Sequence, residues 1–223
     1  LKSKLINKKY INKNFKHLSS QFKKIKFVLL CSVVPNSLKI YKNYFKSKFH
    51  LKTYELKSLN TSNLIKILVN KKQVGSDRLS NAISVSKNKK NYIIVDFGTA
   101  TTFDIVKSGK YLGGIIAPGV KLSLENLVNK ASLIPSIKLN RTSNIIGKNT
   151  VSSVKSGFYW GYVGLIKNIV SLIIKKTKTK YNIIFTGGFA NLFKNSLNYK
   201  IKLDKDVTLN GLIRVIKSQL YER

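Results

Sequence analysis

The sequence predicts a mixed α/β fold, because short apolar runs typical of strands alternate with longer segments of helical spacing. Residues 27–34 and 183–185 are apolar runs of strand length, and turn residues follow each of them. Residues 150–175 carry large apolar side chains at helical spacing. A chain of 223 residues with 43% hydrophobic residues can form one large domain or two small ones.

Strands and helices take turns in the first part of the chain. We expect a Lys-rich helix or loop over 1–24, then the strand at 27–34, which Pro35-Asn36-Ser37 ends. The next elements are a helix from Ser37 to about Phe45, a strand at Leu51–Leu56, a segment of helical spacing at Thr61–Val69 and a helix opened by Gly75-Ser76-Asp77-Arg78. A polar connector at 87–90 then predicts a boundary between domains at 1–90 and 91–223.

The second part begins with a β-meander, a series of strands joined by short turns. Its strands are expected at Tyr92–Asp96, Thr102–Val106 and Tyr111–Ile116. The elements after it are a helix starting near Val120, the long helix at 150–175, a strand at Ile183–Phe185 ended by Thr186-Gly187-Gly188, a helix at Phe189–Phe193 and a terminal helix at Val207–Leu220.

The formal net charge of +34 comes from 42 basic and 8 acidic residues. Lysines lie throughout the chain, which is typical of coding drift in an AT-rich genome. Proteins that recognise specific bases commonly use arginine, which is scarce in this chain. The chain also shows no known nucleic-acid-binding motif. We therefore expect nonspecific, salt-sensitive binding to polyanions and no dedicated nucleic-acid site.

The cysteine and histidine content excludes two kinds of site. The single cysteine, Cys31, cannot form an internal disulfide, and its apolar surroundings predict a buried, inert thiol. His17 and His50 are isolated, so a zinc site of the usual kind is not expected. The longest apolar stretches fall short of the ~20 residues needed to span a bilayer, so we expect no membrane segment.

The segment at 92–106 is the most informative part of the chain. An apolar strand leads to Asp96 and Gly98, and the hydroxyls of Thr99, Thr101 and Thr102 follow at once. One reading is a hairpin whose turn happens to contain Thr and Gly. The other is a ligand loop, in which the Asp96 carboxylate holds a cation and the hydroxyls contact phosphate oxygens.

Acidic residues are few, so three that lie in or beside glycine-containing turns stand out: Asp77, Asp96 and Asp104. Asp77 has two readings. It is either the N-cap of the helix that follows or a carboxylate that deprotonates a substrate hydroxyl while Arg78 grips a polar or anionic group. The Thr186-Gly187-Gly188 turn is likewise either an ordinary turn or a place where a flat ligand group approaches the backbone.

Seven motifs in series resemble the type III pantothenate kinases of bacteria. They are CSVVP at 31–35, VGSDRLSNA at 74–82, VDFGTATTFDIV at 95–106, GGIIAPGV at 113–120, IGKNTVSSVKSGFYWGYVGLI at 146–166, FTGGFANLF at 185–193 and LDKDVTLNGL at 203–212. The resemblance implies an α/β fold of the actin-like (ribonuclease H-like) two-domain kinase type. It also implies ATP-dependent phosphorylation of pantothenate, the first step of coenzyme A biosynthesis, by a cytoplasmic homodimer that uses Mg²⁺ and K⁺ or NH₄⁺.

The same resemblance implies a role for individual residues. Asp77 would be the general base, and it would line the pantothenate site together with Gly75, Ser76, Arg78 and Thr150, the last near the active site of a partner subunit. Asp96 would bind the monovalent cation. The ATP-binding residues would be Gly98, Thr99, Gly187 and Gly188.

The chain departs from the family pattern in two respects. The family's first hairpin, with an Asp-x-Gly-Asn-Thr phosphate loop, has no counterpart before Cys31, and the chain starts at Leu1 and contains no Met. We therefore expect a truncated first domain. Leu68 also replaces an aromatic residue usual in the family. The alternative function is a non-catalytic accessory transcriptional regulator of the same family that binds nucleic acid.

Overall fold

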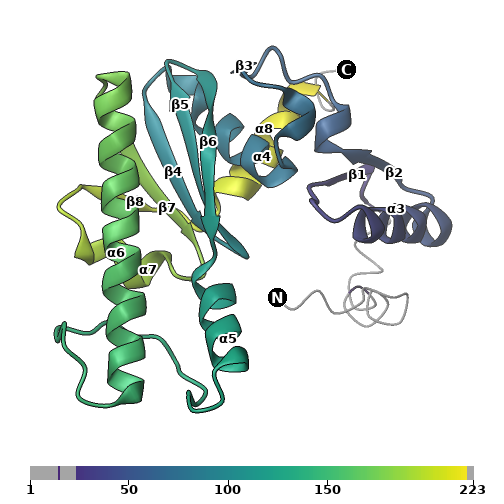
Figure 1. Ribbon diagram of the computed structural model, residues 1–223. Coiled ribbons are helices and arrows are strands. Elements are labelled where there is room, and N and C mark those ends of the chain that lie inside the picture. The colour runs from purple at the N-terminus through teal and green to yellow at the C-terminus, as the bar shows by residue number, and fades with distance from the viewer. Residues whose placement is uncertain (1–14, 16–23, 220–223) are drawn as a thin grey trace.

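A six-stranded sheet forms the centre of the molecule (Figure 1). The computed structural model describes residue 15 and residues 24–219. Across the sheet the strands are β3 (Lys66–Ile67), β6 (Lys110–Pro118), β5 (Ala100–Lys107), β4 (Tyr92–Phe97), β7 (Asn182–Gly187) and β8 (Ile201–Leu203). β4, β5 and β6 form an antiparallel meander, whereas β7 is parallel to β4 and β8 is parallel to β7.

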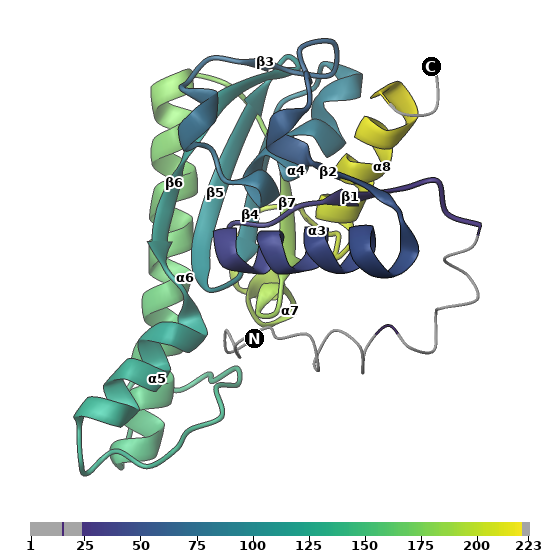
Figure 2. The ribbon, with the colours of Figure 1, turned by 90° about the vertical axis from the view of Figure 1, so that its right-hand side faces the viewer.

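Helices cover both faces of this sheet. α6 (Thr150–Thr177) lies on one face, and α4 (Ser76–Val85) and α8 (Val207–Gln219) lie on the other (Figures 1 and 2). Side chains alternate along β4 accordingly: Ile93 and Val95 join the core beneath α6, and Ile94 packs with Val207 of α8. The centre of the molecule is therefore a three-layer α/β/α unit with a dry core on each side of the sheet.

A smaller unit stands beside the second layer of helices. β1 (Phe27–Leu30) and β2 (Lys52–Glu55) pair in parallel, and α3 (Pro35–Phe49) connects them, with Tyr44, Phe45 and Leu51 buried. The remaining helices are α5 (Val120–Lys130) and α7 (Ala190–Phe193), with short 3₁₀ turns at 56–58, 71–73, 86–88 and 194–196.

The predicted α/β class is confirmed, and the meander, α5, α6, β7 and α8 lie where the sequence indicated. The helical reading of Thr61–Val69 is wrong, because Lys66 and Ile67 pair with β6 and the Leu68 N–H donates to the Tyr111 carbonyl. The first strand ends at Leu30, before residue 34. The expectation for 1–24 falls almost wholly outside the described residues. The domain boundary at residue 90 stays a prediction; β3 and α4, which precede it, lie against the larger sheet.

α6 is the one helix in the described part of the chain that is long and apolar enough to cross a membrane. Over 18 residues its mean hydropathy is 1.3, and 33% of that window is buried in the protein. Its buried side chains, such as Ile166 and Val170, pack on the central sheet. Core helices of soluble proteins have the same composition, so this finding is weak evidence for a membrane segment.

The close approach of α4 and α8 gives a stability prediction. Gly211 of α8 is buried against α4, and a Cβ there would overlap the Ser80 carbonyl oxygen. Gly211→Ala should therefore lower the free energy of unfolding by about 1–3 kcal/mol, the usual cost of overpacking. The measurement is urea denaturation followed by circular dichroism.

The matched control is Asn210→Ala, at an exposed position of the same helix, which should change the free energy of unfolding by less than about 0.5 kcal/mol. If Gly211→Ala instead raises the free energy of unfolding by about 1 kcal/mol, the two helices do not pack this closely. That value of about 1 kcal/mol is expected when a glycine without close neighbours in a helix is replaced by alanine.

Candidate active site

Asp77 lies in the first turn of α4 and is partly exposed. The N-cap of the helix is Gly75, so the reading of Asp77 as the cap is wrong. Its Oδ1 accepts a hydrogen bond of 2.8 Å from the Arg78 N–H. A Cβ at Gly75 would lie 2.6 Å from the same oxygen, so the missing side chain makes room for the carboxylate. Negative charge is favourable in this turn, because the helix dipole is positive there.

Arg78, the next residue, points into the protein. Its Nε donates to Asp104 Oδ1 at 2.8 Å, and its side chain is only 12% exposed. Tyr111 of β6 donates to the same oxygen at 2.8 Å. Burial raises the pKa of Asp104 to about 6, although the Arg78 charge and both hydrogen bonds act to lower it. Arg78 Nη2 has no hydrogen-bond partner among the described residues.

Asp96, near the end of β4, is connected to α4 through a buried amide. Asn81 Nδ2 donates to Asp96 Oδ2 at 3.3 Å, and Asn81 Oδ1 accepts a 2.6 Å hydrogen bond from the Thr208 hydroxyl of α8. Burial raises the pKa of Asp96, the Asn81 hydrogen bond lowers it, and the nearby Asp77 charge raises it further.

Glycines shape the backbone around Asp96. Gly187 ends β7 with φ +87°, and a Cβ there would lie 2.7 Å from Asp96 Oδ1. Gly188 follows and donates its N–H to the Phe97 carbonyl at 3.1 Å. Gly98 and Thr99 form the exposed turn after β4. The two turns lie side by side, since Phe97 pairs with both Thr101 and Gly187.

This donor set fits phosphate groups and a cation. Asp96 offers hard carboxylate oxygens, the space a Cβ would fill at Gly187 lies beside them, and Thr99 carries a hydroxyl in the exposed turn after β4. Within residue 15 and residues 24–219, no group of three His, Cys, Asp or Glu side chains could hold a metal ion. Asp96 is the carboxylate at these turns that could hold a cation.

Thr150 is not brought to this cluster. It is exposed at the start of α6, beyond the N-cap Asn149, whose side chain accepts from the Ser152 N–H at 2.9 Å. In both views the start of α6 lies next to α5, well away from α4 (Figures 1 and 2). Asp77, Arg78, Asp96 and the glycine turns therefore share a region that Thr150 does not reach within the chain.

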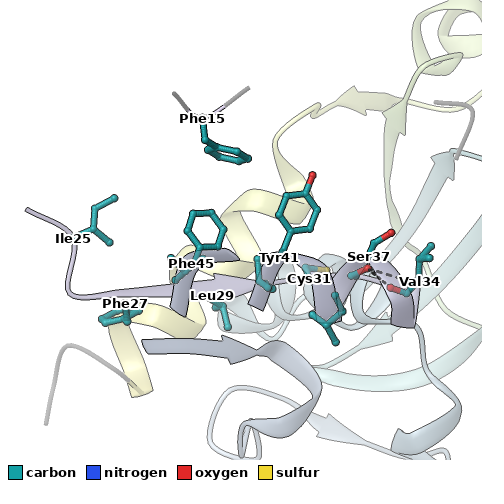
Figure 3. A pocket seen from close by; sticks show the side chains of 13 residues that line it. Phe15, Ile25, Phe27, Leu29, Cys31, Val34, Ser37, Tyr41 and Phe45 are labelled. Carbon is teal, nitrogen blue, oxygen red and sulfur yellow. Dashed lines mark hydrogen bonds between the residues drawn. The ribbon is translucent and has the colours of Figure 1, made fainter. Parts of the chain in front are cut away.

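An apolar cavity of about 610 Å³ lies between β1 and α3 (Figure 3). Its described lining, which includes Ile25, Leu29 and Leu38, contains no charged side chain, so the cavity lacks groups for acid–base or phosphate chemistry. Cys31 borders it, and burial raises the pKa of this thiol to about 12, with Asp77 and Glu55 adding to the shift. The prediction of an inert thiol agrees with this protonated state.

Sequence reasoning missed the residues that support the site. Asn81 lies four residues after Asp77, so helical spacing alone could have placed the two on one face of α4. Asp104 stood out in the sequence without a role. No local signal indicates Tyr111 or Thr208, which approach the site from elements distant in sequence.

Comparison with known proteins shows the family of the chain. The sequence model described as "Type III pantothenate kinase" matches residues 6–172. A protein of this name from Pelagibacter ubique (strain HTCC1062) is 55% identical over 96% of this chain and 86% of its own length. Another, from Pelobacter propionicus (strain DSM 2379 / NBRC 103807 / OttBd1), is 37% identical over 91% and 78%.

Among solved structures, a Baf family transcriptional activator from Campylobacter jejuni has the same fold. Its TM-score is 0.59 at 18% identity, over 90% of this chain and 87% of that one. The family model and the two relatives each cover most of the chain and include the segments that carry Asp77 and Asp96. The chain belongs to the type III pantothenate kinase family.

Proposed function

We propose that this chain transfers the γ-phosphoryl group of ATP to the hydroxyl of pantothenate, giving 4′-phosphopantothenate in the first step of coenzyme A biosynthesis. Its membership of the family supports this activity. The observation that supports the proposal at the level of residues is the hydrogen bond to Asp96 from Asn81, which lies on the helix that carries Asp77. The alternative, a regulator that binds nucleic acid, is not favoured by the names of the relatives.

In this mechanism the chain positions two anionic substrates and removes one proton. The hydroxyl oxygen of pantothenate bonds to the γ-phosphorus, ADP leaves, and the Asp77 carboxylate takes the hydroxyl proton. Gly75 lines the pantothenate side, which Ser76 and Arg78 support with side chains that are largely buried, and Gly98, Thr99, Gly187 and Gly188 line the ATP side. Mg²⁺ and K⁺ or NH₄⁺, when bound, neutralise negative charge on the phosphates, and Asp96 holds the monovalent cation.

The proposal extends to the state of the protein in the cell. We place it in the cytoplasm, because α6 packs on the central sheet with the apolar side chains of its buried face. The charge of +34 should also cause nonspecific binding to polyanions that weakens steeply as the salt concentration rises.

The first test is the reaction itself with an Asp77→Asn variant. ATP-dependent phosphorylation of pantothenate is followed by coupling ADP release to NADH oxidation. Removal of the base should lower kcat by about 100- to 10,000-fold, the usual contribution of general-base catalysis. ATP binding, measured by calorimetry, should be largely retained because the ATP-side turns are intact.

Glu125→Gln is the matched control, since Glu125 is an exposed acid of α5 whose ion pair with Lys121 spans 3.8 Å at the surface. It should have the activity of the unchanged chain. An Asp77→Asn protein with near-normal turnover would remove Asp77 from the role of base.

A second prediction concerns the cation. Asp96→Ala should raise the ATP concentration needed for half-maximal rate and flatten the dependence of the rate on K⁺, because the variant lacks the carboxylate nearest the phosphate turns. Initial rates are measured over a series of KCl concentrations at constant ionic strength. Asp206→Ala changes an exposed acid and should respond to K⁺ normally. Full K⁺ activation in Asp96→Ala would place the cation elsewhere.

A third prediction is that the chain forms a homodimer through α6. The outer face of this helix presents Gly157, Gly161 and Gly164, where a Cβ would meet no atom within 4 Å, and Leu172 is 54% exposed. Sedimentation velocity at micromolar concentration should show a dimer, and Gly161→Arg should dissociate it without unfolding. Lys176→Ala, near the helix end, should leave it intact. A monomer at this concentration would contradict the proposal.

A further inference from the structure

Asp104 is a fully buried carboxylate that the proposed reaction does not use. It lies in the middle of β5 with no exposed surface, and Arg78 and Tyr111 both donate to its Oδ1. Its Oδ2 has no hydrogen-bond partner among the described residues, and Arg78 Nη2 is also left over. One hydrogen bond therefore joins Arg78 to Asp104, whereas an arginine and a carboxylate can form two parallel hydrogen bonds.

Stability alone explains this arrangement poorly. Taking a carboxylate and a guanidinium out of water is expensive, and buried ion pairs can often be replaced by apolar side chains without loss of stability. The incomplete pairing increases the cost, because two buried polar atoms lose water without gaining a partner. A role for the pair in the working site accounts for its presence better than a role in stability does.

The position of Arg78 is fixed from three elements. Asp104 of β5 holds Nε, and Gly114 of β6 leaves the space for Nη2, which a Cβ at this glycine would overlap. Arg78 is itself part of the first turn of α4, and its N–H donates to Asp77 Oδ1 at 2.8 Å. Displacement of the Arg78 side chain would therefore disturb the turn that orients the Asp77 carboxylate.

We propose that Asp104 is a positioning residue for phosphoryl transfer, which acts through Arg78 to hold the first turn of α4 and the Asp77 carboxylate in place. Asp104 touches neither substrate. The inference rests on the proposed function, because it requires Asp77 to be the base. Asp104 contributes to the reaction only through its contact with Arg78.

The decisive variant is Asp104→Asn. The amide keeps an oxygen that can accept from Arg78 and Tyr111, but it carries no charge to hold the guanidinium. We expect kcat to fall about 10- to 100-fold, since small displacements of reacting groups have effects of this size, while the KM for ATP stays near its original value. Thermal unfolding by circular dichroism verifies that the assayed protein is folded.

Phe103→Leu is the matched control. Phe103 is fully buried on the same strand but faces the core beneath α6. Its substitution destabilises the protein without touching Arg78, so kcat at 25 °C should be unchanged. A loss of activity in both variants, in proportion to their loss of stability, would overturn the positioning role.

The pH profile gives a readout that a structural role does not produce. With Arg78 and Asp77 of α4 and Tyr111 of β6 facing it, Asp104 has a pKa of about 6. Protonation below this pH releases Arg78, so kcat/KM for pantothenate should fall as the pH decreases through about 6. Asp104→Asn should lack this step. Tyr111→Phe removes a hydrogen bond that lowers the pKa of Asp104 and should move the step to higher pH.

The outcomes separate this inference from the proposed function. A folded Asp104→Asn variant with unchanged kcat and an unchanged acid step would overturn the positioning role, while an inactive Asp77→Asn variant still supported Asp77 as the base. An active Asp77→Asn variant would overturn both. If Asp104→Asn fails to fold, Tyr111→Phe decides: a step moved to higher pH supports the role, and an unmoved step overturns it.

Discussion

The docking of α4 on the central sheet determines the geometry of the whole site. Three side chains of this ten-residue helix make polar contacts with different elements: Arg78 with β5, Ser80 with the Thr208 carbonyl of α8, and Asn81 with β4. Each contact is at least partly buried, so its geometry is favoured by the cost of leaving a polar group unpaired. Asp77 lies in the first turn of the same helix. The contacts of α4 with the sheet and with α8 therefore fix the position of Asp77 relative to Asp96.

The charge distribution suits a site for anionic substrates. The chain has only 8 acidic residues against 42 basic ones, yet the Asp77 charge acts on both Asp96 and Asp104. Burial, with a smaller contribution from the Asp77 charge, raises the pKa of Asp96 and of Asp104, so a cation bound beside these carboxylates would favour their charged forms. The surrounding positive charge should attract ATP and pantothenate towards the site before any specific contact forms.

The sequence predicts the parts of this site that depend on local patterns. Asp96, Gly98 and Gly187 follow buried strands, and strand ends in a parallel pair meet at one edge of the sheet, as β4 and β7 do. The helical prediction for 61–69 is wrong because Leu64 and Ile65 pack into the core from a turn, Ile67 packs there from a two-residue strand, and Leu68 is exposed. Tyr111, Thr208 and the Asp104–Arg78 pair could not be found in this way, because each depends on contacts between elements far apart in sequence.

α6 shows how one helix can serve both the fold and the site. Its 28 residues extend over roughly 42 Å at the usual rise per residue. One face packs on the sheet, and Tyr162, near the middle of α6, donates to Ser123 of α5 at 3.0 Å and so joins the two helices. The other face, with three glycines open to solvent, lets a second helix approach closely. Since Thr150 lies at the far end from α4, a contact between Thr150 and the site at α4 would have to be made in a second copy of the chain, and the glycine face is a surface through which that copy could pack.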